Sequence, residues 1–131
     1  MTSKREGFHT LTPYVVLRDA AAAIEFYKQA FQATVLEQQM DEQGLVRHAE
    51  IKIGNSPVMI TSECQEWPEL RSVQALGGLG VQMFLYVQNA DAVVGQAVAA
   101  GATSKGPVED KPYGRSGGVV DPYGLTWWIC S

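Results

Sequence analysis

The sequence predicts an α+β fold in which two tandem βαβββ modules form a curled mixed sheet around a cavity. The order strand, helix, three strands occurs in the first half of the chain and starts again in the second half. The stretch VVLRDAAAAIEFYKQAFQA also aligns with FLYVQNADAVVGQAVAAGA at an offset of 69 to 70 residues, which is typical of an internal duplication. Because one helix covers only one face of a four-stranded sheet, two such units can enclose a shared cavity with their other faces.

The composition is that of one globular unit. Of the 131 residues, 46% are hydrophobic and 18% are charged, the formal net charge is -4, and the basic residues form no patch. Nucleic acid and membranes are therefore not expected as partners, and no apolar run approaches the length of a membrane span. The N-terminus lacks the apolar stretch of a signal sequence, and Cys64 and Cys130 form no CxxC pair. We expect a cytoplasmic location with both thiols reduced.

The first module is expected over residues 11–63, after an N-terminal extension of residues 1–10 that contains His9. Its opening strand is rich in β-branched and aromatic residues, and Pro13 places that strand at a sheet edge or near its own start. Asp19 is a plausible N-cap for a helix whose apolar residues recur at three- and four-residue spacing. The predicted elements are a strand at 11–18, a helix at 20–31, and strands at 34–40, 46–53 and 57–62.

The second module is expected over residues 81–131, after a connector at 64–80 that contains Pro68 and several glycines. Asn89 is a second plausible N-cap, and Gly101 is suited to end the helix that follows. The predicted elements are a strand at 81–88, a helix at 90–100, and strands at 103–108, 115–121 and 125–130, with the turn Asp121-Pro122-Tyr123-Gly124 before the last strand.

Three stretches carry a resemblance to a known family: TPYVVLRDAAAAIEFYKQAF, RHAEIKIG and GRSGGVVDPYG. Together they resemble the vicinal oxygen chelate superfamily, the group of glyoxalase I, fosfomycin-resistance enzymes, extradiol dioxygenases and bleomycin-resistance proteins. The Thr-Pro-Tyr start and the His-Ala-Glu strand are most similar to its PhnB-like branch. The resemblance extends from about Leu11 to Ile129, and it implies the fold predicted above.

The resemblance also implies where metal ligands would lie, one on each of four strands. The four positions correspond to Thr12, Ile60, Gln82 and Trp128. Isoleucine and tryptophan offer no lone pair to a metal ion, and threonine and glutamine are weak neutral donors. A register shift of one residue would replace Ile60 by Met59 or Thr61, which are no better. We therefore expect a protein without a bound metal ion and without any other cofactor.

Trp127 and Trp128 are adjacent on a predicted strand, so their side chains point to opposite faces of the sheet. Trp128 falls at a ligand position and is expected to point into the cavity, whereas Trp127 is expected to pack against the helices. An indole in a cavity is a stacking platform for flat or hydrophobic molecules. The metal-free relatives that resemble bleomycin-resistance proteins bind drugs in this way. The alternative is that Trp128 only fills the cavity.

Further candidates for lining the cavity share a strand face with Thr12 and Gln82. Tyr14 lies two residues from Thr12, and Phe84 and Tyr86 follow Gln82 at the same alternation, although Phe84 also suits a core position.

Tyr113 and Arg115 belong to a glycine-rich loop expected near the cavity mouth. There Arg115 is either a bidentate donor to a ligand carboxylate or phosphate, or an ordinary surface arginine. His48 and Glu50 share one strand face, and they form either an acid–base pair, a metal half-site, or a hydrogen-bonded polar pair on the open sheet.

Three functions stay open on these grounds. The first is a metal-free protein that binds a small hydrophobic or aromatic molecule for resistance or sequestration, and the second is a glyoxalase-type enzyme with a displaced site at His48 and Glu50. The third is an interaction domain with a closed core. The substituted metal positions favour the first over the second, and no residue pattern names a ligand. We also expect a homodimer, because curled sheets leave apolar edges uncovered and related proteins close their cavities between two chains.

Overall fold

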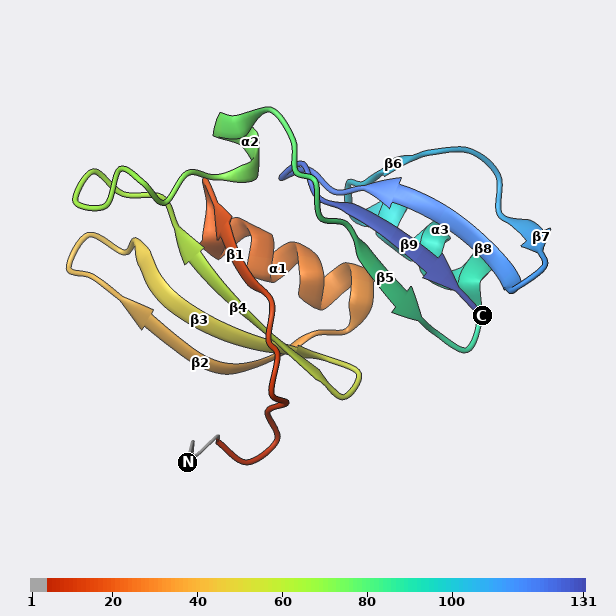
Figure 1. The fold of residues 1–131 in the computed structure, drawn as a ribbon, viewed down its shortest axis with the longest axis horizontal. Helices are drawn as coiled ribbons and strands as arrows, with labels where there is room; N and C mark the ends of the chain where they lie inside the picture. Colours follow the sequence, from red (N-terminus) through yellow and green to blue (C-terminus); the bar gives the residue numbers. More distant parts are fainter. Residues whose placement is uncertain (1–4) are drawn as a thin grey trace.

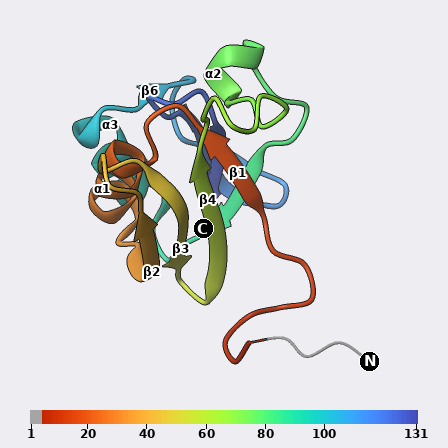
Figure 2. The same ribbon diagram turned by 90° about the vertical axis from the view of Figure 1, so that its left-hand side faces the viewer.

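The computed structural model describes residues 5–131 and has the predicted α+β architecture (Figure 1). Two mixed sheets lie side by side, and they do not join into a closed barrel within this range. Helices α1 (Ala20–Phe31) and α3 (Ala90–Ala100) contact each other on one side of the sheets, whereas the described residues before β1 lie on the other side (Figure 2). We call the side turned away from α1 and α3 the open face. None of the helices in residues 5–131 is long and apolar enough to cross a membrane.

The first sheet has the strand order β1-β4-β3-β2. Strand β1 runs parallel to β4, and the other two pairs are antiparallel. Pro13, which has no backbone N–H to donate, comes directly before β1, and β1 is an edge strand as predicted. The strands are β1 (Tyr14–Leu17), β2 (Thr34–Met40), β3 (Val46–Ile53) and β4 (Ser56–Ser62).

The second sheet has the order β5-β9-β8-β6, with β7 paired to the outer part of β8. The strand predicted at 103–108 is shorter in the structure and covers only residues 103–104, because Gly106 adopts a φ of 127° and Pro107 lacks a donor, so the chain turns there. The connector also contains a short helix, α2 (Val73–Leu76), that is too brief to show a period in the sequence. The strands are β5 (Met83–Tyr86), β6 (Thr103–Ser104), β7 (Glu109–Lys111), β8 (Gly114–Val120) and β9 (Thr126–Cys130).

Both long helices begin and end at the predicted residues because their caps are local. The Asp19 carboxylate accepts a hydrogen bond from the Ala22 N–H at 3.1 Å, and the Asn89 side chain accepts one from the Ala92 N–H at 3.0 Å. Gly101 then ends α3 with a φ of 127°. These caps fix where α1 and α3 start, and therefore which residues face the sheets.

The core lies between the two helices and the sheets. Trp127 of β9 is 4% exposed, and its ring lies 4.7 Å from the Phe31 ring and 5.5 Å from the Tyr27 ring of α1. It packs against the helices, as predicted. The largest apolar side chains that are almost fully buried are Leu17, Ile24, Ile51, Ile60 and Ile129.

A buried carboxylate connects the two halves of this core. Asp121, in the turn before β9, is 3% exposed, and its Oδ2 accepts hydrogen bonds from the Tyr27 hydroxyl at 2.6 Å and the Trp127 indole N–H at 2.9 Å. Its Oδ1 accepts hydrogen bonds from the backbone N–H groups of Tyr123 and Leu125, at 2.9 and 3.0 Å. Burial, and then the nearby Asp121 charge, raise the pKa of Tyr27 well above its ordinary value of 10.0.

Replacing Tyr27→Phe should lower the free energy of unfolding at pH 7 by about 1.5–3 kcal/mol, because a charged acceptor loses a buried donor. The matched control is Tyr86→Phe, since Tyr86 is 78% exposed. The raised pKa also sets a pH dependence: the stabilisation is complete below about pH 10 and is lost as pH rises through the pKa of the folded state. Urea melts from pH 7 to 11 should show the Tyr27→Phe deficit shrinking at high pH. Equal stabilities of the two variants at pH 7 would contradict this role for Asp121.

Candidate functional site

The open face of the second sheet carries a group of exposed aromatic side chains. Phe84 is 48% exposed, Tyr86 78% and Tyr113 63%. The Phe84 ring centroid lies 5.1 Å from that of Tyr86 and 6.3 Å from that of Tyr113. Phe84 also pairs with Trp128 in the parallel register of β5 and β9, so it belongs to the surface rather than to the core. We call Phe84, Tyr86, Tyr113 and Trp128 the aromatic platform.

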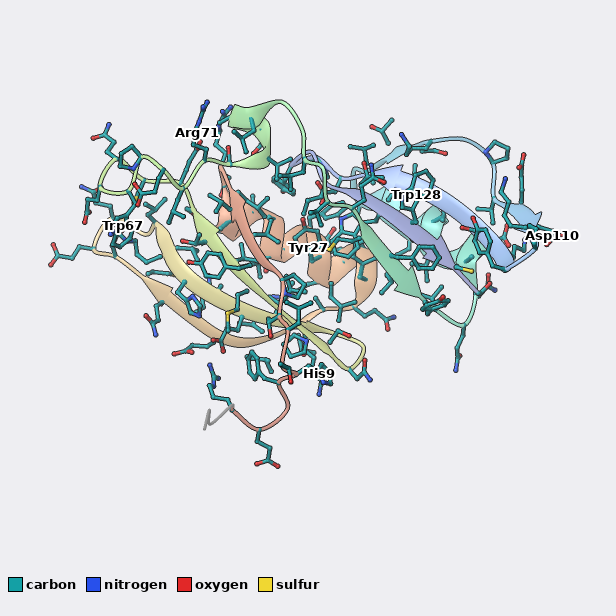
Figure 3. The ribbon with its side chains drawn as sticks, viewed as in Figure 1. His9, Tyr27, Trp67, Arg71, Asp110 and Trp128 are labelled. Atoms are coloured by element: carbon teal, nitrogen blue, oxygen red, sulfur yellow. The ribbon has the colours of Figure 1, made fainter. Side chains whose placement is uncertain are left out.

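Trp128 is half-buried, and its ring lies over the backbone of β8 (labelled in Figure 3). A Cβ on Gly118, its partner in β8, would lie 2.6 and 2.7 Å from Cζ3 and Cε3 of the indole, so only glycine leaves room for the ring. The indole N–H donates to the Gln82 side-chain oxygen at 2.6 Å, and Lys105 Nζ lies 5.8 Å from the ring centroid. Gly118 and Lys105 were missed by the sequence analysis, although a Gly-Gly pair inside a strand is a signal of close approach.

Three spaces adjoin the second sheet. A pocket of about 180 Å³ beside Trp128 is lined by Tyr113 and Lys105, among others. A groove of about 270 Å³ lies between β1 and β5, where Tyr14 and Leu79 form apolar walls and Arg71 contributes a cation. A wider cleft of about 620 Å³, where β5 and the end of α1 approach α3, contains none of the predicted site residues except Tyr86.

The four positions implied by the family resemblance do not fit a metal ion. Thr12 lies just before β1, and Gln82 and Trp128 form a hydrogen bond with each other. Ile60 was wrongly expected to face the cavity: it is 1% exposed and pairs with Val15 in the core. The alternation along β4 directs Val58 and Ile60 toward the core, which leaves Met59 and Thr61 on the other face. This donor set has no imidazole, thiolate or carboxylate, the ligands that a catalytic divalent ion needs.

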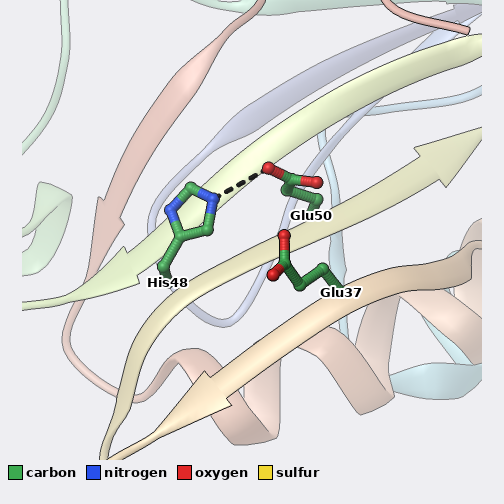
Figure 4. A group of neighbouring side chains, drawn as sticks. All are labelled: Glu37, His48 and Glu50. Carbon is green, nitrogen blue, oxygen red and sulfur yellow. Dashed lines mark hydrogen bonds and ion pairs between the residues drawn. The ribbon is translucent and has the colours of Figure 1, made fainter. Parts of the chain in front are cut away.

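The open face of the first sheet is polar where the second is aromatic. His48 Nε2 lies 2.9 Å from Glu50 Oε2, so the two residues form the hydrogen-bonded pair that was one of the alternatives (Figure 4). Glu50 is only 2% exposed, and Arg5 Nη1 lies 2.6 Å from each of its carboxylate oxygens. The Tyr14 ring centroid lies 6.4 Å from that of His48, which places Tyr14 between this polar region and the groove.

Opposing effects set the ionisation of Glu50. Burial alone would raise the pKa of its carboxyl group, but the hydrogen bonds from His48 and Arg5 and the Arg5 charge outweigh it, so the pKa is lowered. Glu50 is therefore a charged acceptor at neutral pH. Arg5 was missed from the sequence because it lies in the extension, 45 residues away from its partner, and no local pattern indicates the contact.

Of the two alternatives for Arg115, the structure shows a surface arginine in a group of ion pairs. Its guanidinium donates to both Asp91 oxygens, at 2.6 and 3.1 Å, and to Asp110 at 3.1 Å. These carboxylates raise the pKa of Arg115 further, and the pairing lowers the pKa of Asp91. The side chain thus connects β8 to α3 instead of pointing to a ligand.

A profile of the Glyoxalase/Bleomycin resistance protein/Dioxygenase superfamily matches residues 8–129. The chain belongs to this superfamily. The uncharacterized protein Rv0887c of Mycobacterium tuberculosis is 37% identical over 120 residues, which are 89% of this chain and 71% of that protein.

Solved structures share the fold of this chain. The X-ray structure of an Arabidopsis thaliana gene product is 26% identical with a TM-score of 0.79, over 95% of this chain and 99% of that one. TioX from Micromonospora sp. ML1 is 27% identical with a TM-score of 0.72, over 92% and 96%. A Bacillus cereus PhnB protein has a TM-score of 0.71 at 16% identity, over 93% and 98%, which is a likeness of fold alone.

Replacing Gly118→Ala should displace the Trp128 indole, because the new methyl group overlaps two ring carbons. The expected result is a changed near-UV circular dichroism spectrum and a new chemical shift for the Trp128 indole N–H, while the far-UV spectrum is kept. Gly95→Ala is the control, since a Cβ there meets nothing within 4 Å and alanine suits a helix. An unchanged Trp128 signal in Gly118→Ala would show that the ring does not rest on β8.

Proposed function

We propose that this superfamily member binds a small flat hydrophobic or aromatic molecule on its open face, by stacking against Trp128. The observation that carries the proposal is the aromatic platform, in which three of the four rings are between 48% and 78% exposed. Contiguous apolar surface of this kind marks interaction sites on soluble proteins. Aromatic rings add offset or edge-to-face contacts with a planar ligand to the burial of its apolar area.

Two contacts hold the Trp128 ring in place before a ligand arrives. The N–H group is bonded to Gln82, so it does not need a ligand acceptor, and the six-membered ring rests on Gly118. A ring fixed in its bound orientation loses little conformational entropy on binding. This preorganisation supports a stacking role over a role as a plug, because a plug would be enclosed on all sides and Trp128 remains half-buried.

The proposal includes a second copy of the chain. The pocket beside Trp128 is about 180 Å³ and the groove between β1 and β5 is about 270 Å³, both below the roughly 300–1,000 Å³ of ordinary ligand sites. A homodimer that packs open faces together would enclose both spaces. Each ligand would then contact two chains.

Catalysis at His48 and Glu50 has less support. A general base must keep a lone pair free for the proton that it removes. Both Glu50 oxygens accept a hydrogen bond from Arg5, and Oε2 is also hydrogen-bonded to His48. The Glu50 residue is only 2% exposed. This arrangement stabilises a charge instead of exposing a reactive group to a substrate.

Replacing Trp128→Ala should weaken the binding of a flat aromatic ligand by roughly 1–2 kcal/mol, through loss of a stacked pair and its buried area. A ligand for this comparison is first identified by titrating the wild-type protein with a library of small aromatic molecules and following its intrinsic fluorescence. Trp127→Ala is the control on the opposite face: it should empty core volume and lower the free energy of unfolding by roughly 3–5 kcal/mol, more than Trp128→Ala does. If no library member binds, or if Trp128→Ala is the more destabilising change, Trp128 is a plug and the binding proposal is wrong.

Sedimentation equilibrium at micromolar concentration should give about twice the chain mass of 14.3 kDa. Phe84 is 48% exposed on the open face of a single chain. Replacing Phe84→Glu puts a charge there and should shift the equilibrium toward the monomer. Val98→Glu is the control, because Val98 is 41% exposed on α3, on the helical side. A wild-type monomer, or dissociation by Val98→Glu alone, would exclude a dimer formed through the open faces.

A further inference from the structure

We propose that Glu37, His48 and Glu50 form a site for a divalent transition-metal ion, and that Arg5 holds the place of the ion in the metal-free protein. One ligand atom from each of the three side chains can be chosen so that all lie within 4.8 Å of one another (Figure 4). One imidazole nitrogen and two carboxylate oxygens are a donor set that suits Zn²⁺ and similar ions. The site lies on β2 and β3, away from the four positions that the family resemblance implies.

The register of the sheet creates this convergence. Glu37 pairs with Glu50 across β2 and β3, and His48 is two residues from Glu50 on the same face of β3. Two carboxylates placed side by side repel each other unless a cation joins them. The cluster therefore needs a positive charge, and Glu50 needs it most because it is 2% exposed.

Arg5 supplies that charge from outside the sheets. Its Nη1 is 2.6 Å from both Glu50 oxygens and 3.6 Å from Glu37 Oε2. The Arg5 side chain itself is 57% exposed, and its guanidinium carbon lies 4.7 Å from the ring centroid of Phe8, which is buried. The cation at the centre of the cluster thus comes from an exposed residue in the segment before β1, and not from a strand of the sheet.

The balance of charge favours a divalent ion over the arginine once the two compete. With His48 neutral, two carboxylates and one guanidinium leave a net charge of -1, whereas the same carboxylates around a divalent ion are neutralised. Three protein ligands also leave a coordination position free for water or another small molecule. Arg5 and the ion need the same Glu50 lone pairs, so binding of one excludes the other. The metal affinity of the wild-type protein is consequently masked by Arg5.

The test is the variant Arg5→Gln, which removes the competing charge. Chelator-treated protein is titrated with Co²⁺, read by its visible absorption, and with Zn²⁺, read by calorimetry. Arg5→Gln should bind one ion per chain at least about 10-fold more tightly than wild type, and adding His48→Gln to it should weaken binding by about 10-fold or more. Arg18→Gln is the matched control, since Arg18 is 56% exposed and pairs with Glu63 away from the cluster.

Arg5→Lys keeps a cation without the guanidinium fork, so its metal affinity should lie between those of wild type and Arg5→Gln. This variant decides the matter if Arg5→Gln does not fold. Equal affinities in wild type, Arg5→Lys and every folded Arg5 variant would overturn the proposal, as would binding that His48→Gln leaves unchanged. In that case Arg5 and Glu50 are a structural ion pair only. The result is independent of aromatic binding at Trp128.

Discussion

The hydrogen bonds of the Asp121 carboxylate hold the fold together, because they join α1 of the first half to β9 of the second. Burying a charge costs several kcal/mol unless hydrogen bonds compensate it, and here two backbone N–H groups, Tyr27 and Trp127 do so. The turn that starts at Asp41 makes the same local bonds, with two backbone N–H groups at 2.9 Å from Oδ1. Asp41 Oδ2 lies 3.7 Å from Arg47 Nη1 at the surface. The same pattern of local hydrogen bonds thus shapes a surface turn at Asp41, whereas at Asp121 it also holds α1 and β9 together in the core.

The position of Trp128 follows from that anchor. Asp121 fixes Trp127 against α1, and the one-residue alternation of β9 then directs Trp128 to the open face. Gly118 provides the space that the indole occupies, and Gln82 satisfies its N–H group. The two halves of the open face consequently differ: charged groups on the first sheet and aromatic rings on the second. A ligand that spans both would be flat and apolar at one end and polar at the other.

The features that the sequence predicts well are those with local causes. Both helices have local caps and begin and end as predicted, and the opposite faces of the two tryptophans follow from strand alternation alone. Ile60 was placed on the wrong face because counting from a remote motif does not fix a strand register to one residue. The pairings of Arg5 with Glu50 and of Arg115 with Asp91 join residues 45 and 24 positions apart. Such contacts depend on the tertiary fold, and no periodicity or motif encodes them.

The central claim is that the open face beside Trp128 is the ligand site, and it can be tested on the unmodified protein by following its indole N–H groups. Trp67, Trp127 and Trp128 give three resonances in a ¹H–¹⁵N spectrum, from a surface loop, the core and the aromatic platform. Addition of a flat aromatic ligand should move the Trp128 signal in a saturable way and leave that of Trp127 in place. A ligand that binds while Trp128 does not shift, or that shifts backbone signals only in the cleft where α3 approaches the end of α1, would contradict the account.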